Sequence, residues 1–402
     1  MLPKRLPRFV YAQALSLLAL VTATSLQAQV VIEPIEGTGG FASANPIRSD
    51  PTGRVFALFR RERVLRIAGP EAGIISEIRL DHPSLSPYPS LLGWKGDTLW
   101  ITNSSQNGAV FFDGDGTPVR TIDFALPGPA GEVSSRRVHG FLPEARVILS
   151  TGASLAALAA SDPVFESVLP ALHPQIQPAH PVSELPILIA NLEGSVLDTV
   201  AVLAVNKTGA LIVPPEEERG SERLLVSQVG QPYADSDLFS VSPDGSSIWV
   251  IQRRVPCGAD PSFRLLRVAP NSDTLVDRVV PFVPQAIEPA WVREKVTELA
   301  RGLPGPPERA AEAVRAAIHI PHYLPPVTRV LSDLQGWVWL QRETPPEAES
   351  LTWDVFSPSG SMLHTLQIPS HFSLRAISGT MGWAVKQDEA GRLYRISKRA
   401  RR

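Results

Sequence analysis

The chain has 402 residues, of which 44% are hydrophobic and 19% are charged, and its formal net charge at pH 7 is −2. A charge balance this close to zero gives no electrostatic attraction for nucleic acid or for an anionic membrane, so neither partner is expected. The single cysteine, Cys257, excludes an internal disulfide. The 39 prolines and 28 glycines are typical of a turn-rich all-β protein.

The first 28 residues have the pattern of a secretory signal peptide. Basic residues precede an apolar run over 9–26, and small and polar residues follow it, which predicts cleavage after Ala28. An uncleaved membrane anchor is the alternative, although a spanning helix needs about 20 apolar residues and this run is shorter. We therefore expect residues 29–402 to form a single domain that is periplasmic or extracellular, monomeric, and without membrane contact after cleavage.

A turn followed by an apolar strand recurs six times along the chain. The turns contain glycine or other turn-forming residues, and the residues after them are β-branched or aromatic, as in buried strands. The predicted strands are 55–59, 99–102, 146–150, 248–251, 337–340 and 383–385.

A hairpin follows each of the first five of these strands. The predicted pairs are 64–69 with 73–80, 109–116 with 118–124, 187–194 with 195–203, 263–270 with 273–282, and 352–360 with 361–369. Each unit therefore amounts to a sheet of four short antiparallel strands, and such a sheet repeated around an axis is a propeller blade.

The sixth unit ends before its outer strand. It has an inner strand near 374–377, a second at 383–385 and a third at 392–396. An extra strand at 30–35 precedes the first unit, and pairing it with the last strand would complete the sixth blade and remove an exposed edge. We therefore predict an all-β fold, a six-bladed β-propeller whose N-terminal strand closes the last blade.

The turn Pro243-Asp244-Gly245, followed by Trp249, is the clearest copy of the repeated motif. On this motif and its weaker copies, residues 30–398 resemble six-bladed propellers of the NHL and TolB-like kind, which include exported bacterial proteins. The resemblance implies an architecture and no particular activity.

Three long insertions interrupt the repeat, at 152–185, 204–238 and 283–326. The first lies between the second and third strands of blade three, and the other two join consecutive blades, so all three are expected on one face of the ring. Apolar residues at helical spacing predict a small helical insertion between blades four and five. It either packs an apolar stripe on the propeller or acts as a lid over the central channel.

Polar residues follow the second strands at the face that carries the insertions. A ring of cations at the mouth of the channel could bind a carboxylate or phosphate, because a guanidinium group can bind either in a bidentate manner. The alternative is ordinary pairing with nearby acids such as Glu62, Glu343, Asp388 and Glu389. The predicted ligand-binding residues are Arg60, Asn103, Arg253, Arg254, Arg342 and Lys386.

No motif points to a metal or to catalysis. His319 and His322 have a spacing that can share a metal on a helical turn, but Pro321 between them disturbs such a turn. Propeller lactonases similar to gluconolactonase place an acidic metal ligand before a proline where this chain has Asn45, and no G-x-S-x-G motif is present.

We therefore expect no catalytic residue, no metal ligand and no cofactor. The predicted function is an exported binding or scaffold propeller for a small anionic ligand, a glycan or a protein. The alternative is a hydrolase or lyase that uses calcium or zinc at the channel mouth, and a metal assay on the purified protein separates the two.

Overall fold

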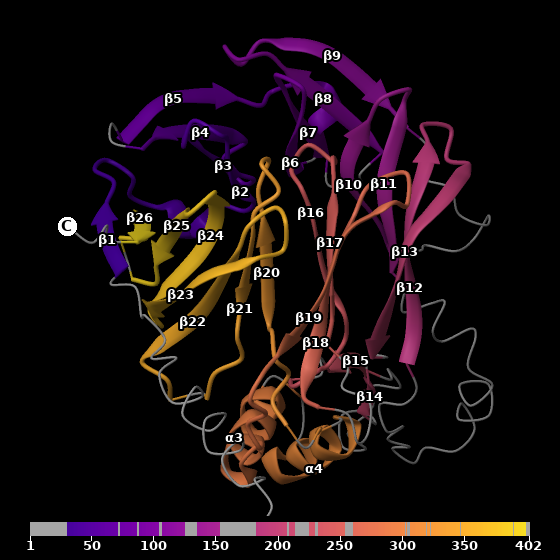
Figure 1. Cartoon of the computed structure of the whole chain (residues 1–402), viewed down its shortest axis with the longest axis vertical. Helices are drawn as coiled ribbons and strands as arrows, with labels where there is room; N and C mark the ends of the chain where they lie inside the picture. Colours follow the sequence, from indigo (N-terminus) through magenta and orange to yellow (C-terminus); the bar gives the residue numbers. More distant parts are fainter. Residues whose placement is uncertain are drawn as a thin grey trace, which may run out of the picture.

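The computed structural model describes residues 30–70, 73–86, 88–103, 107–124, 135–152, 182–206, 209–213, 225–229, 232–253, 260–301, 303, 306–318, 320–321, 323–345, 347–388 and 390–398. Six four-stranded antiparallel sheets are arranged around a centre, with one strand of each sheet innermost (Figure 1). The predicted six-bladed β-propeller is confirmed.

Blades one to three follow the predicted order of inner, second, third and outer strand. Blade one consists of β2 (Ile47–Ser49), β3 (Val55–Phe59), β4 (Val64–Gly69) and β5 (Gly73–Arg79). Blade two consists of β6 (Pro89–Lys95), β7 (Thr98–Asn103), β8 (Gly108–Phe112) and β9 (Pro118–Asp123). Blade three consists of β10 (Ser135–Leu142), β11 (Arg146–Gly152), β12 (Val182–Asn191) and β13 (Val196–Asn206).

Blades four to six repeat this order. Blade four consists of β16 (Leu238–Val241), β17 (Ile248–Gln252), β18 (Ser262–Val268) and β19 (Thr274–Pro281). Blade five consists of β20 (Arg329–Ser332), β21 (Val338–Gln341), β22 (Ser350–Phe356) and β23 (Met362–Pro369). Blade six consists of β24 (Phe372–Ser378), β25 (Met381–Lys386), β26 (Leu393–Lys398) and β1 (Val30–Pro34).

The N-terminal strand closes the ring as predicted. β1 pairs antiparallel with β26, with Val30 opposite Lys398 and Pro34 opposite Tyr394. An ion pair between Arg395 and Glu33 at 2.5 Å joins the same two strands. Pairing within one sheet therefore ties the two ends of the propeller together.

The blades pack through both faces of each sheet, since every residue of β3 and of β8 is buried. Tryptophans of the second strands also reach the next blade. The indole Nε1 of Trp249 donates to the carbonyl oxygen of Gly336 at 3.2 Å, and that of Trp339 donates to Gly379 at 3.0 Å. The turn residues and the tryptophans of the repeat therefore interlock consecutive blades.

The helical insertion is present between blades four and five, as predicted. α3 (Pro289–Ala300) and α4 (Pro307–Ala317) lie side by side (Figure 1), and they pack through a shared apolar cluster that includes Val296 and Val314. Trp291 of α3 contacts Tyr233, which lies in the connection between blades three and four. The helix pair therefore has its own small core, and a second apolar cluster joins α3 to the connection between blades three and four.

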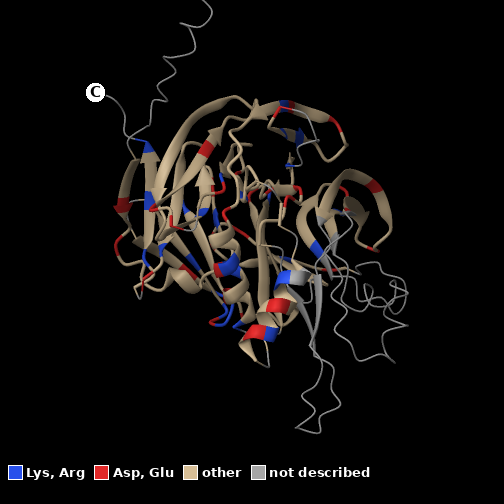
Figure 2. Ribbon diagram, turned by 90° about the horizontal axis from the view of Figure 1, so that it is seen from below, with Lys and Arg blue, Asp and Glu red and all other residues tan. Residues whose placement is uncertain are grey.

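An additional hairpin, β14 (Gly209–Val213) with β15 (Leu225–Val229), lies within the second insertion and was not predicted. It lies beside α4 (Figure 1). Basic and acidic residues are mixed on the two helices (Figure 2), so neither helix presents a surface of one charge.

Candidate functional site

The inner strands of the six blades surround the centre of the ring. Every blade runs in the same strand order, so every inner strand begins at one face and every second strand ends there. The connections β11–β12, β13–β16 and β19–β20, which contain the three insertions, leave from this same face. We call it the insertion face, and the opening of the central channel there the mouth.

Four arginines lie within the first four residues of their inner strands. Arg48 is on β2, Arg137 on β10, Arg329 on β20 and Arg375 on β24. Since all inner strands begin at the insertion face, the four residues lie in the half of the channel next to the mouth. Arg60 directly follows β3, which ends at the same face.

The electrostatic interactions show that these side chains converge. The charge of Arg48, on blade one, lowers the pKa of both His139 on blade three and Arg329 on blade five. Blades one, three and five alternate around the ring, so these interactions pass across the central space. Burial and the neighbouring Arg375 also lower the pKa of Arg329, to about 10, and burial is the largest cause. Burial lowers the pKa of Arg48 as well.

None of these arginines has a carboxylate partner within the described ranges. Arg48 donates only to the carbonyl of its own neighbour Ile47 at 3.3 Å. The Nε atoms of Arg60 and Arg375 are buried without a hydrogen-bond partner. Arg137 is exposed, whereas Arg48, Arg60, Arg329 and Arg375 are half-buried, and guanidinium groups removed from water are normally paired with acids in folded proteins.

His139 adds a neutral polar group to the cluster. Burial, together with the charges of Arg137 and Arg48, lowers the pKa of His139 to about 3. Its Nε2 lies 2.8 Å from the hydroxyl of Ser150. The imidazole is therefore uncharged at neutral pH, and it adds no positive charge to that of the arginines.

The opposite end of the channel is narrowed by contacts between blades that are not neighbours. The backbone N–H of Trp94 on blade two donates to the carbonyl of Pro243 on blade four at 2.8 Å. Leu334, from the first turn of blade five, packs against the core shared by blades one and two. These contacts lie toward the ends of the inner strands away from the insertion face, whereas the four arginines lie toward the insertion face.

A cavity of 960 Å³ adjoins the mouth between blades one and two. Arg60 lines this cavity and donates to the carbonyl of Ser90 at 3.0 Å. Burial and the charge of Arg137 lower the pKa of Arg60, burial being the larger cause. Arg60 therefore connects the cavity to the arginines of the channel. The cavity is lined by Ser43, Asn45, Phe59, Arg60, Arg61, Glu62, Tyr88, Pro89 and Ser90.

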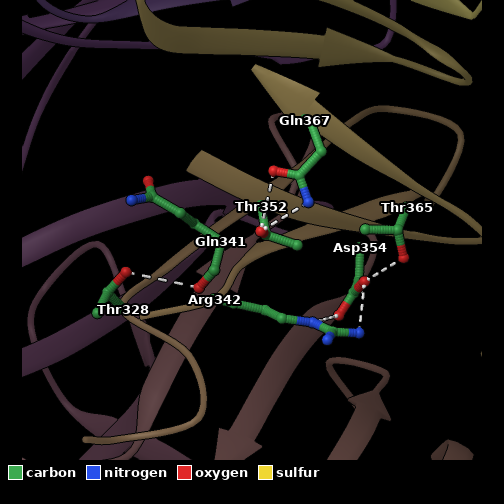
Figure 3. Close-up of polar contacts among 7 residues, drawn as sticks. All are labelled: Thr328, Gln341, Arg342, Thr352, Asp354, Thr365 and Gln367. Atoms are coloured by element: carbon green, nitrogen blue, oxygen red, sulfur yellow. Dashed lines mark hydrogen bonds and ion pairs between the residues drawn. The ribbon is translucent and has the colours of Figure 1, made fainter. Parts of the chain in front are cut away.

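The other predicted ligand-binding residues occupy different surroundings. Arg342 forms a bidentate ion pair with Asp354, at 2.6 and 3.0 Å, and Thr365 donates to the same carboxylate at 2.7 Å (Figure 3). In the same view Thr352 and Gln367 bond to each other on the neighbouring part of the sheet. The carboxylate of Asp354 thus neutralises the Arg342 guanidinium from within the blade.

Three further predicted residues are also engaged within the protein. Lys386 pairs with Asp388 at 3.0 Å. Arg253 is buried and donates to the backbone carbonyls of Ser236 and Val327. Asn103 exchanges two hydrogen bonds with Asn107, which close the turn after β7. Asn103 also lines a second cavity of 490 Å³. Arg254 lies outside the described residues.

The four channel arginines Arg48, Arg137, Arg329 and Arg375 were not predicted. Their common signal is an arginine near the start of each of four inner strands, but two of these strands, β2 and β20, have only three and four residues. The buried second and third strands could be predicted from the sequence, whereas most of the inner strands could not.

No group of three or more histidine, cysteine, aspartate or glutamate residues that could hold a metal ion occurs in the described part of the chain. His319 and His322 lie outside that part, as does Cys257. No helix among the described residues is long and apolar enough to span a bilayer.

No protein-family model and no curated protein matches the chain. Among solved structures it is similar to a luciferin-regenerating enzyme, with 11% identity, 92% of this chain and 95% of the other covered, and a TM-score of 0.38. It is also similar to virginiamycin B lyase from Staphylococcus aureus, with 10% identity, 92% of this chain and 99% of the other covered, and a TM-score of 0.37. For the calcium-binding protein regucalcin from Agrobacterium tumefaciens, the identity is 11%, the coverage is 92% of this chain and 94% of the other, and the TM-score is 0.37. At these values the similarities carry no argument about activity.

A second group of charged side chains lies near α3. Burial raises the pKa of Glu343, which follows β21, to about 7, although the charges of Arg253 and Lys295 oppose the shift. Burial and the charge of Glu343 raise the pKa of Tyr233. Glu343 therefore stays largely protonated in the folded protein at pH values where the unfolded chain ionises it.

This shift makes stability depend on pH. The folded protein retains a proton that the unfolded chain loses between about pH 4.5 and pH 7, so the Glu343 contribution falls as pH rises through this window. We expect Glu343→Gln to raise the unfolding midpoint at pH 8 by roughly 1–2 °C, the shift that about 1 kcal/mol produces in a domain of this size. At pH 4.5 the same substitution should change the unfolding midpoint little.

Thermal unfolding at pH 4.5 and pH 8 measures this effect. The control is Glu347→Gln, because Glu347 is exposed. Equal midpoints for Glu343→Gln and the unmodified protein at pH 8 would contradict the role of Glu343.

Proposed function

We propose that the protein binds a small anionic molecule in its central channel, through Arg48, Arg137, Arg329 and Arg375. The observation that carries the proposal is that four inner strands each place an arginine toward the insertion face, and that none of the four forms an ion pair with a carboxylate among the described residues. Like charges held together at a partly buried site cost stability, and an anion that binds between them offsets this cost. Because the four arginines come from inner strands at the centre of the ring, a small molecule is favoured over a glycan chain or a protein.

Binding is expected to depend on the channel arginines and not on arginines in general. Arg48→Gln and Arg329→Gln should each weaken binding by roughly 10–100-fold, as expected for one charge-assisted interaction. Arg264→Gln is the matched control, because Arg264 is exposed and pairs with Asp277 on the outer part of blade four. Isothermal titration with acetate, sulfate and citrate at low ionic strength measures the effect.

The same variants test folding independently. Removing one member of an unneutralised cluster relieves repulsion, so Arg48→Gln should unfold at the same or a higher temperature than the unmodified protein. A saturating anion should stabilise the unmodified protein more than the variant. Equal affinity of Arg48→Gln and the unmodified protein for every anion that binds would reject the proposal.

We also propose that the protein acts outside the cytoplasm, in the periplasm or beyond, as a monomer. The N-terminal pattern of basic, apolar and small residues over 1–28 supports export. Mass spectrometry of the protein recovered from the periplasm or medium would give a mature N-terminus at Gln29.

A further inference from the structure

The number of hydrogen-bond donors in the channel limits the chemistry of the ligand. Each guanidinium group carries five N–H donors, so Arg48, Arg137, Arg329 and Arg375 present about 20 together. A carboxylate offers two oxygens in one plane, with about four lone-pair sites. It can satisfy one or two arginines that approach along its open edge, and it leaves the others unneutralised.

The directions of approach add a second limit. The four arginines come from blades one, three, five and six, so they surround the channel on several sides. A ligand that contacts most of them needs acceptor oxygens on several sides and more than one negative charge. Tetrahedral oxyanions have this form, and arginine is the side chain that binds phosphate oxygens in pairs.

We infer that the channel recognises a tetrahedral oxyanion with two negative charges, either free phosphate or the terminal phosphate group of an organic ester. This inference rests on the proposed function and specifies the ligand of the same site. The cavity of 960 Å³ beside Arg60 and Tyr88 adjoins the mouth, and it has room for the organic part of an ester.

The channel arginines and His139 keep their charge states between pH 5 and pH 7.5. Arginine does not lose its proton in this range, and His139 stays neutral because its pKa is about 3. At the mouth, Arg61 and Glu62 line the cavity, and Glu62 pairs with Arg66. Glu343, which follows β21 at the insertion face, ionises within this range, so a change of affinity for methyl phosphate that exceeds the change for sulfate reports the ionisation of the ligand.

Titration of the full protein with methyl phosphate, sulfate and acetate tests the inference. The second ionisation of a phosphate ester occurs near pH 6, so the dianion rises about tenfold between pH 5 and pH 7.5. We expect the affinity for methyl phosphate to rise by about the same factor. Sulfate is a dianion throughout and should bind equally at both pH values. Acetate should bind at least about tenfold more weakly than methyl phosphate at pH 7.5.

Variants and two further ligands complete the experiment. Arg329→Gln should lose most of the affinity for methyl phosphate and sulfate, while Arg264→Gln keeps it. Inorganic phosphate and phenyl phosphate distinguish the source. If inorganic phosphate binds more tightly than phenyl phosphate, the ligand is a free anion. If phenyl phosphate binds more tightly than inorganic phosphate, and Tyr88→Ala removes that difference, the ligand is an ester whose organic part enters the cavity.

The experiment distinguishes a failure of the dianion inference from a failure of the proposed function. If acetate binds as tightly as methyl phosphate, or if the affinity for methyl phosphate does not change with pH, the dianion inference is wrong while anion binding stands. If none of the anions binds the unmodified protein at either pH, the proposed function itself is wrong.

Discussion

Removal of β1 is expected to destabilise the entire propeller by more than about 4 kcal/mol, an effect that single surface changes do not reach. A chain that begins at Gly37 lacks the five residue pairs between β1 and β26. It also lacks Ile35, which is 3% exposed within the core of blades one and six. The loss leaves β26 as an unpaired edge and opens the seam of the ring.

Urea unfolding followed by circular dichroism measures this loss, and a peptide provides the control. A synthetic peptide of residues 28–36 should restore stability in a concentration-dependent manner, because it can add to the open edge as a strand. If the truncated chain does not fold, Ile35→Ala in the full chain should still cost about 2–4 kcal/mol. A truncated chain as stable as the intact protein would show that the seam is not closed by β1.

Trp339→Ala is expected to cost about 3–5 kcal/mol, the range for removing a large buried aromatic side chain. Trp339 is fully buried between blades five and six, and its Nε1 donates to Gly379 at 3.0 Å. Its ring lies close to Gly382, where an added Cβ would meet it at 3.2 Å. Truncation would therefore remove both the packing and the hydrogen bond that join the two blades.

Trp339→Phe separates these two contributions, since it keeps an aromatic ring and loses the N–H donor. We expect it to cost about 1–3 kcal/mol, from the lost hydrogen bond and the smaller volume. Val119→Ala on the exposed outer strand β9 should change stability by less than about 0.5 kcal/mol. Equilibrium unfolding in urea measures all three. Equal stability of Trp339→Ala and Val119→Ala would show that the tryptophan does not hold the blades together.

The fold could be predicted because its signals are local and repeated. Turns such as Pro243-Asp244-Gly245, followed by largely buried strands, recur at each blade, and the count of strands requires 30–35 to complete the sixth. The hairpin β14–β15 could not be predicted in the same way, because it lies in an insertion and belongs to no blade.

The predicted ligand-binding residues lie at the ends of second strands, one strand farther from the centre than the channel arginines. Residues at the ends of the second strands, such as Arg342 and Lys386, follow recognisable apolar strands, yet they pair with Asp354 and Asp388. Arg48 lies in an inner strand of only three residues. A strand this short has too few residues to show the apolar pattern that marks a buried strand. Its importance becomes visible only when the ring brings it near His139 and Arg329.

The ion pair between Glu33 and Arg395 joins residues that are 362 positions apart. During synthesis on a ribosome the first strand leaves the exit tunnel long before its partner exists. Five blades can form in the meantime, but the torus cannot seal until the last residues emerge. We expect partly synthesised chains to be sensitive to proteases and prone to strand pairing between molecules. A chaperone that covers the first strand would reduce both the proteolysis and the pairing.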